Sequence, residues 1–277
     1  MNRKSFFTTT MILAFVIAIV YLFVTAPAKI EVSKSLAKNT FSVEDGFKIV
    51  AAYNDLTRTF YTKNIVGAGK NVGLMFDEDW KDDNVEAGPL PALFLRETSN
   101  YIEKSKVKLG LYLGSEFPIS EANLFTGVQA EYFEKIKANK QPQFFFDDDT
   151  QRYVGMFPDF ASAKACITCH NEHPDSPRND WKLGDIMGAT TWSFKSDSLT
   201  TDELIEWIKV YGEGTKHTYQ LYLEEVNNFT TADIPAIGNL YPSEGYQLPS
   251  VTSLEDTISK LSSTILLSNL LRKEDEK

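Results

Sequence analysis

The chain has 277 residues, of which 43% are hydrophobic, so it is long enough and apolar enough for one large or two small globular domains. Its formal net charge of −10 argues against nucleic acid or an anionic lipid surface as a partner, because both would repel an acidic surface. The sequence offers no pairing of a nucleophile with a base, so we expect that the protein is not an enzyme.

The N-terminus has the features of an export signal. Residues 2–4 are Asn-Arg-Lys, an apolar run extends from Met11 to Val24, and Ala26-Pro27-Ala28 supplies small residues for a signal peptidase. Residues 6–24 are also numerous enough to span a bilayer. A cleaved signal peptide over residues 1–28 and a retained anchor over residues 6–24 therefore both remain open. Either one predicts a periplasmic protein, soluble or anchored to the inner membrane, that meets the membrane only through this segment.

The next part of the chain alternates between helical and strand patterns. In chain order we expect a helix that starts at Ser42-Val-Glu-Asp45, a solvated acidic loop over 77–86, a helix after Pro89 and Pro91, a half-buried strand over 107–113 and a helix over 121–137. Strands over 143–146 and 152–157 follow, joined by a turn at Asp147–Thr150. After a loop, residues 186–194 return as a strand. Helices followed by hairpin-connected strands predict an α+β fold with an antiparallel sheet.

The chain from residue 197 onward reads as a helical extension. Thr201-Asp-Glu-Leu204 opens a helix in which Leu204, Ile208, Tyr211 and Leu221 could pack on the main domain. A loop containing proline and glycine then leads to an amphipathic helix over 253–271, which is too polar to be a membrane span. The predicted organisation is a signal or anchor helix over 1–28, a domain over 38–196 and an extension over 197–277.

The loop before the last predicted strand contains Cys166-Ile-Thr-Cys169-His170. These are the only two cysteines of the chain, and it has three histidines. This spacing is typical of covalent haem attachment, in which each thiol adds to a haem vinyl group and the histidine binds the iron. A redox dithiol is an alternative, but it would be expected in a βαβ unit with the first cysteine opening a helix. A zinc site that includes His173 is another, although adjacent Cys169 and His170 suit tetrahedral ligation poorly.

A longer stretch around this motif carries a family resemblance. Residues Cys166–Pro177 and Asp180–Asp185, with Leu90–Glu97 and Arg152-Tyr153 upstream, resemble the single-haem c-type cytochrome domain with a PAS-like fold (the Tll-type periplasmic haem c domain). This family, long catalogued as a domain of unknown function, is similar to the chain over roughly residues 40–195. It implies a PAS-like antiparallel sheet with flanking helices. Its members occur alone in bacterial periplasms and as the sensing part of membrane-bound signalling proteins.

The resemblance implies one covalent haem c, with Cys166 and Cys169 in the thioethers and His170 as the axial iron ligand. Some members use a cysteine of the N-terminal helix as sixth ligand, but both cysteines of this chain are already committed. The remaining candidates are Met75, Met156, Met187 and His173, and an open position is equally compatible with the sequence. For His173 we expect a structural role, because a loop of three residues that ends at a proline is too short to reach the opposite face of the porphyrin.

Other side chains near the motif have two possible roles. Trp181, Phe157 and Trp192 could enclose the haem or belong to the general core. Arg178 and Lys182 could meet the haem propionates or form an exposed basic pair. His217 is expected to be a surface or packing histidine.

The resulting expectation is an exported haem c-binding protein that acts as a redox or gas-responsive sensor. The alternative is a periplasmic single-haem electron-transfer cytochrome. Both need the cytochrome c maturation machinery, and a sensor would also need a separate redox or signalling protein as its partner.

Overall fold

The computed structural model describes residues 15, 40–230, 234–243 and 245–275, with side chains up to Ser263. Apart from Phe15, the predicted signal or anchor segment lies outside the described residues. Thr40–Lys277 form one compact unit. In the part of the chain that is described, no helix combines the length and apolar character needed to cross a membrane. The elements are β1 (Thr40–Ser42), α2 (Val43–Phe60), η2 (Tyr61–Gly67), α3 (Ala68–Asn71), β2 (Phe76–Asp77), β3 (Gly88–Pro89), α4 (Pro91–Lys104), β4 (Gly110–Gly114), η3 (Glu121–Asn123), α5 (Gly127–Asn139), β5 (Gln143–Asp147), β6 (Arg152–Phe160), α6 (Lys164–Glu172), β7 (Ile186–Phe194), β8 (Ser198–Thr200), α7 (Thr201–Asn227), β9 (Ile237–Gly238), β10 (Leu248–Pro249) and α8 (Val251–Asp275).

A four-stranded antiparallel sheet lies at the centre of the unit, with strand order β4-β7-β6-β5. β6 and β7 pair from Tyr153↔Phe194 to Phe160↔Ile186, with one irregularity at Asp159/Phe160. The predicted α+β class with antiparallel strands is thus confirmed. Because β6 and β7 are antiparallel neighbours, the segment between them, which contains the Cys-Ile-Thr-Cys-His motif, is not a βαβ crossover.

Helices cover both faces of the sheet, as strand alternation requires. Phe47 of α2, Leu95 of α4 and Trp207 of α7 belong to one buried cluster with Trp192 and Phe194 of β7. On the opposite face, α5 packs on the sheet in a second cluster formed by Phe125, Phe133, Ile136, Phe145, Val154, Met156 and Ala189. The sheet therefore separates an α2/α4/α7 side from an α5 side.

α2 begins where the sequence predicts. The Ser42 hydroxyl accepts a hydrogen bond from the backbone N–H of Asp45 (3.1 Å), which satisfies one of the free donors of the first helical turn. The helix continues without interruption into the π-helix η2 and the short α3. π-Helical segments are rare and are frequent at functional sites, and this one precedes the segment that faces α6.

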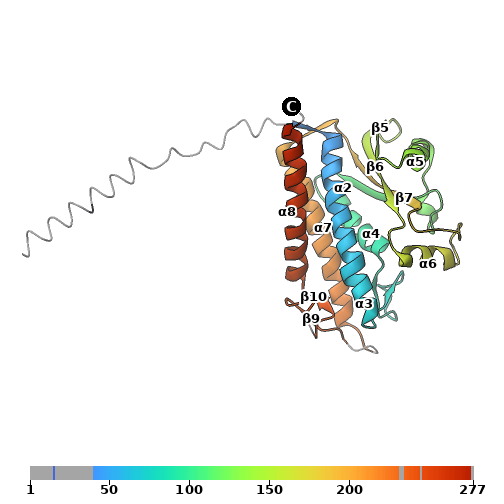
Figure 1. Cartoon of the computed structure of the whole chain (residues 1–277), viewed down its shortest axis with the longest axis vertical. Coiled ribbons are helices and arrows are strands. Elements are labelled where there is room, and N and C mark those ends of the chain that lie inside the picture. Colours follow the sequence, from blue (N-terminus) through green and yellow to red (C-terminus); the bar gives the residue numbers. More distant parts are fainter. Residues whose placement is uncertain (1–14, 16–39, 231–233, 244, 276–277) are drawn as a thin grey trace, which may run out of the picture. The chain divides into compact units, whose positions relative to one another are not determined.

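The C-terminal helices share the core of the earlier part. α2, α7 and α8 stand side by side in Figure 1, and buried residues of α7 lie in the same cluster as those of α2. The close approach of α7 requires Gly46 on α2, because a Cβ there would lie 3.0 Å from the Trp207 ring. α7 begins at Thr201, as predicted, and Thr200 and Glu203 form a capping box at its start. Leu204 and Tyr211 pack in the core as expected.

Three local expectations were wrong. The helix predicted over 121–137 is divided into η3 and α5, because Phe125 is buried and its N–H bonds to the carbonyl of Ser115 (2.9 Å). The strand predicted from 107 starts at Gly110, since Lys108 has a positive φ of 57°. The motif expected in a loop lies in the helix α6.

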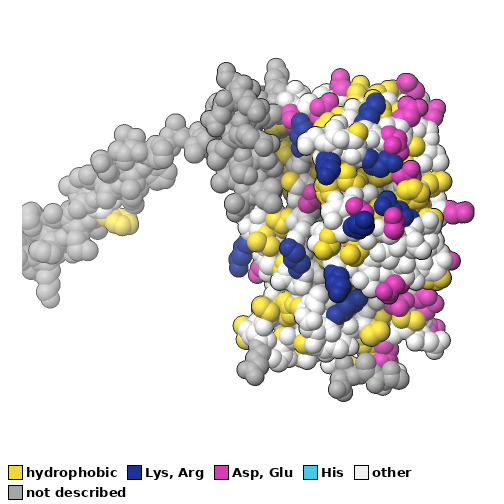
Figure 2. Space-filling view, turned by 45° about the vertical axis from the view of Figure 1, so that its right-hand side comes forward, with side chains coloured by type: hydrophobic (Ala, Val, Ile, Leu, Met, Phe, Trp, Pro, Cys, Tyr) yellow, Lys and Arg dark blue, Asp and Glu magenta, His cyan; other side chains and the backbone are white. Residues whose placement is uncertain are grey.

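Charged side chains are unevenly spread over the face shown in Figure 2. Lys and Arg lie there in several separate groups among apolar side chains, while Asp and Glu are more numerous toward the edge farthest from the grey residues. On this face no single basic patch offsets the net acidic charge.

Candidate functional site

The helix α6 presents the motif at the surface. Cys169 and His170 lie three and four residues beyond Cys166, so the three side chains project from one side of the helix. Both thiols are free, and Cys169 is exposed. α6, which is described in full, has no buried residue. It ends at Glu172 because Pro174 restricts the preceding residue, His173, to extended backbone (φ −66°, ψ 129°).

A hydrogen bond connects the end of α6 to the segment after α3. Nε2 of His173 lies 2.7 Å from a carboxylate oxygen of Glu78, and Nδ1 of His173 accepts a hydrogen bond from the backbone N–H of Asp175 (3.1 Å). Both ring nitrogens of His173 therefore have partners. The acidic loop predicted to be solvated contributes Glu78 to the site.

His170 differs from His173 in having an unpaired ring nitrogen. Its Nδ1 is buried and has no hydrogen-bond partner among the described residues. Burial lowers the pKa of His170, and the charge of His173 acts in the same direction, while Asp159 and Glu78 oppose the shift. The imidazole is therefore neutral at pH 7, the form that binds a metal ion.

The thiol of Cys169 is not activated by its surroundings. Burial raises its pKa, the carboxylate of Glu78 adds to the shift, and Lys70 opposes it. A nucleophilic redox cysteine needs the opposite shift. α6 does place Cys166 in its first turn, as in a redox dithiol, but it joins antiparallel strands. Of the features expected for a redox dithiol, the helix at the first cysteine is therefore present. The βαβ unit and a lowered pKa of Cys169 are not.

A buried cation lies at the base of the site. Nη2 of Arg58 on α2 donates to the Asp159 carboxylate (2.9 Å) and Nη1 lies 3.3 Å from the Thr190 hydroxyl, whereas its Nε is buried without a partner among the described atoms. Asp159 stands near the end of β6, just before α6. Burial lowers the pKa of Arg58, but the charges of Asp159 and, more weakly, of Asp55 on α2 outweigh this effect and raise it.

The segment after α6 folds back onto it. The side-chain amide of Asn171 donates to the carbonyl of Trp181 (3.0 Å) and its oxygen accepts from the N–H of Trp181 (2.8 Å). Arg178 lies 3.9 Å from the Trp181 ring centroid and pairs with Asp180 (2.6 Å) and Asp185 (3.6 Å). In this arrangement Arg178 already has carboxylate partners, and Lys182 is exposed.

The other predicted aromatic residues and His217 lie in the core or between helices. Trp192 is fully buried and packs on Tyr211, and Phe157 contacts Phe144 at the edge of the same cluster. The ring of His217 packs on Tyr101 of α4. Of the three aromatic residues that were predicted to lie near a haem, Trp181 is thus the one with a contact to α6.

Two of the three methionine candidates lie on the α5 side of the sheet, away from Asp159. Met156 is fully buried in the cluster beneath α5, and alternation along β7 places Met187 on the same face as Ala189 of that cluster. Asp159, which pairs with Arg58, lies on the opposite face. Met75 is 65% exposed and belongs to the segment that carries Glu78 to His173. Of the three, Met75 therefore lies in a segment that contacts the end of α6.

A zinc site receives no support from the donor arrangement. Within the described residues, no three His, Cys, Asp or Glu side chains converge where they could hold a metal ion. Cys166, Cys169 and His170 would instead suit a cofactor that makes its own covalent bonds to the two sulfurs.

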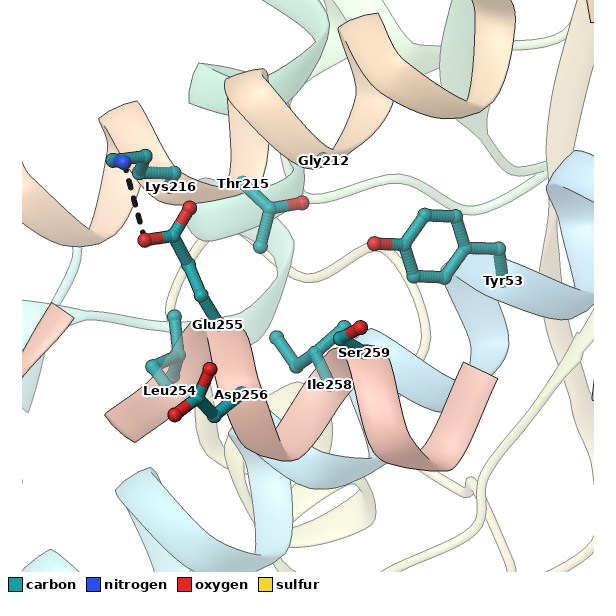
Figure 3. A pocket seen from close by; sticks show the side chains of 9 residues that line it. All are labelled: Tyr53, Gly212, Thr215, Lys216, Leu254, Glu255, Asp256, Ile258 and Ser259. Carbon is teal, nitrogen blue, oxygen red and sulfur yellow. Dashed lines mark ion pairs between the residues drawn. The ribbon is translucent and has the colours of Figure 1, made fainter. Parts of the chain in front are cut away.

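One hollow in the described part of the chain has no lining residue from α6. It measures about 380 Å³ and is lined by Tyr53 of α2, by α7 and by α8. Figure 3 shows the Tyr53 hydroxyl pointing toward Thr215, with Lys216 and Glu255 paired across the opening (3.1 Å). No residue of the motif lines it.

Sequence reasoning missed Arg58, Asp159 and Glu78. Arg58 and Asp159 are 101 residues apart, and no local pattern relates them. For Glu78 the sequence contained one signal, the acidic run over residues 77–86. An acidic run nonetheless indicates a solvated loop by default.

Comparison with known proteins gives a family for this arrangement. A search of curated proteins and a search of solved structures each returned no match. A family model described as Tll0287-like (Tll0287) matches residues 34–194, more than half of the 277 residues. The match spans α2, the sheet and α6, and so includes the motif and the side chains around it. The chain therefore belongs to the Tll0287-like family.

Proposed function

We propose that the protein is an exported haem c-binding protein that responds to redox state or to a small gas. The observation that carries the proposal is the side of α6 on which two free thiols, one helical turn apart, stand beside His170 with its unpaired Nδ1. Cys166 and Cys169 would form the thioethers and His170 would bind the iron. The bound haem would supply one-electron redox chemistry and a coordination position for a gas.

The surroundings of α6 suit an apolar macrocycle. Large apolar side chains are exposed in the segments that adjoin the helix: Val72, Met75, Phe160 and Leu183 are between 39% and 65% exposed. Exposed apolar side chains in these segments are available for contact with an apolar group. Covering them with a porphyrin would remove apolar area from water, which stabilises the complex by roughly 25 cal/mol per Å².

The fold supports a sensory role more than a catalytic one. In this proposal the sheet β4-β7-β6-β5, covered on both faces by helices, is a PAS-like core. α2 runs from the segment that follows the predicted export signal to the site, where it places Arg58. A change at the site could therefore alter a long packed helix.

Electron transfer is the second candidate. α6 has no buried residue and the apolar side chains around it are exposed, so a cofactor held there would lie near the surface. A nearby surface edge is what an electron carrier needs for exchange with its partner. In both roles the maturation machinery of cytochrome c and a redox or signalling protein are the expected partners, outside the cytoplasm.

Expression with a cytochrome c maturation system tests the central proposal. We expect a pyridine haemochrome of type c and haem that stays with the polypeptide on a denaturing gel. Cys166→Ala and Cys169→Ala should each weaken or abolish this attachment. Haem that is lost on denaturation, or stoichiometric zinc in its place, would refute the proposal. Mass spectrometry of the same sample shows whether residues 1–28 are removed.

The sixth ligand is tested by paired variants. We propose Met75 or an open position, because Met156 and Met187 lie toward α5 and both nitrogens of His173 have partners. Met75→Leu should convert a low-spin spectrum to high-spin and remove a methionine–iron charge-transfer band if Met75 is the ligand. Met156→Leu, a volume-conserving change in the core, should leave the spectrum unchanged.

A further inference from the structure

Among the Lys/Arg–Asp/Glu pairs near the motif in the described part of the chain, Arg58 and Asp159 form the least exposed one. The side chain of Arg58 is 19% exposed and that of Asp159 is 27% exposed. Their N–O distance is 2.9 Å, a charge-assisted hydrogen bond. Burying a charge costs free energy unless the charge has a partner. Each of these two charges therefore stabilises the other in its partly buried position.

The backbone fixes Asp159 at the start of the segment that leads to α6. Two residues later the N–H of Ala161 donates to the carbonyl of Asp185 (2.8 Å), and the carbonyl of Ala161 accepts from Gly184 (3.0 Å). Arg58 reaches this point from α2 and also bonds Thr190 on β7. Three elements thus meet at the base of α6, and the field of Asp159 is felt by the His170 ring.

We infer that the Arg58–Asp159 pair sets the reduction potential of an iron held by His170, an inference that rests on the proposed haem binding. Oxidation adds one positive charge at the iron. A nearby carboxylate without its partner would favour the oxidised form, and a nearby guanidinium without its partner would favour the reduced form. Together the two charges cancel, so the intact pair keeps the potential between these limits.

Asp55 adds a further negative charge to this group. It acts on Arg58 from the same helix and is exposed on its outer side. Glu78 and His173 also act on His170 from the other end of α6. The potential should therefore be measured at one fixed pH, above the pKa of Asp55 at about 6.

The experiment is a mediated one-electron titration of the haem-loaded protein. Arg58→Gln leaves the Asp159 carboxylate unpaired and should lower the potential, whereas Asp159→Asn should raise it. We expect each ferric/ferrous equilibrium to move about tenfold, which is about 59 mV for one electron. The double variant R58Q/D159N should return toward the wild-type value. Arg58→Lys keeps the charge and should shift the potential little, which covers the case in which Arg58→Gln folds poorly.

The Lys137–Glu116 pair on the α5 side of the sheet is the matched control. Its N–O distance is 2.6 Å, and Lys137→Gln and Glu116→Gln should leave the potential unchanged. A purely structural pair would lower stability in both Arg58 and Asp159 variants without opposite shifts of potential. Equal potentials, or shifts of the same sign, in haem-loaded Arg58→Gln and Asp159→Asn would overturn the inference alone. Wild-type protein without covalent haem would overturn the proposed function and this inference with it.

Discussion

His170 and His173 are three residues apart in the chain and differ in their hydrogen-bond partners. His173 donates toward Glu78 and accepts from the backbone at Asp175, so it fixes the end of α6 to the segment after α3. His170 has no such partner at Nδ1 among the described residues. A buried imidazole nitrogen without a partner costs free energy, and this cost is expected at a position selected for binding.

Replacing His173 with Gln should weaken the anchoring of α6 without removing the proposed iron ligand. We expect the free energy of unfolding to fall by about 1 kcal/mol, as for a partly exposed charged hydrogen bond. Urea denaturation measures this, and Glu78→Gln should give a similar loss. In haem-loaded protein both variants should keep the wild-type visible spectrum. A change from low spin to high spin in His173→Gln would instead make His173 an iron ligand.

Asp55 gives a pH dependence whose sign follows from its surroundings. Loss of hydration among the packed helices raises its pKa to about 6, Arg58 opposes the shift and Asp159 adds to it. The folded state therefore binds this proton more tightly than the unfolded chain, so folding is favoured below the unfolded pKa. That contribution is lost as the pH rises through about 6.

The variant Asp55→Asn should accordingly be more stable than wild type at pH 7.5, and the difference should shrink toward pH 4. The effect should be small, because Asp55 is an exposed residue and water screens its charge. Urea titrations of both proteins at the two pH values measure the difference. Lower stability of Asp55→Asn at pH 7.5 would mean that Asp55 mainly serves as a counter-charge to Arg58.

α7 is the element that joins the C-terminal part to the sheet. Its Trp207 is fully buried, lies stacked on Phe47 of α2 (5.7 Å between centroids) and meets Phe194 of β7 edge-on (4.8 Å). The residues after 196 thus contribute to the core on which α2 and the sheet rest. An amphipathic helix of this kind owes its stability mainly to such packing.

Removing the Trp207 side chain tests this dependence. We expect Trp207→Ala to lower the free energy of unfolding by about 3–5 kcal/mol, the range for a buried aromatic residue replaced by alanine. Ile205→Ala is the control on the same helix, since Ile205 is exposed and should change stability by roughly 0.5 kcal/mol or less. A Trp207→Ala protein of wild-type stability would show that the sheet and α2 do not depend on this side chain of α7.

At the scale of the whole molecule, the features that could be predicted from the sequence are those that depend on residues close together in the chain. The strand 186–194 was predicted with the bounds it has, and the start of α2 followed from Ser42 and its acidic third position. The pairing of Arg58 with Asp159 and of His173 with Glu78 could not be predicted, since it depends on how distant segments meet. The helical form of the motif was missed because cysteine, threonine and isoleucine are weak helix formers.

The arrangement of α2 and α8 separates a sensor from an electron carrier. α2 carries Arg58 at the site and Tyr53 at the hollow, where Leu254 and Ile258 of α8 pack on it. The start of α2 and the end of α8 lie at the same end of the unit (Figure 1). A sensor would convert a change at the site into a change in this packing, whereas a carrier needs no such coupling.

Limited trypsin digestion of the haem-loaded protein can detect the coupling. Lys260 of α8 is exposed, and cleavage there requires local opening of the helix. For a sensor we expect the rate of cleavage at Lys260 to change when carbon monoxide is added to the reduced protein, because the ligand binds the two packing states with different affinity. Cleavage at Lys140, at the end of α5 on the far side of the sheet, should stay constant. Unchanged cleavage at both sites, together with rapid electron exchange with a periplasmic cytochrome, would favour the carrier.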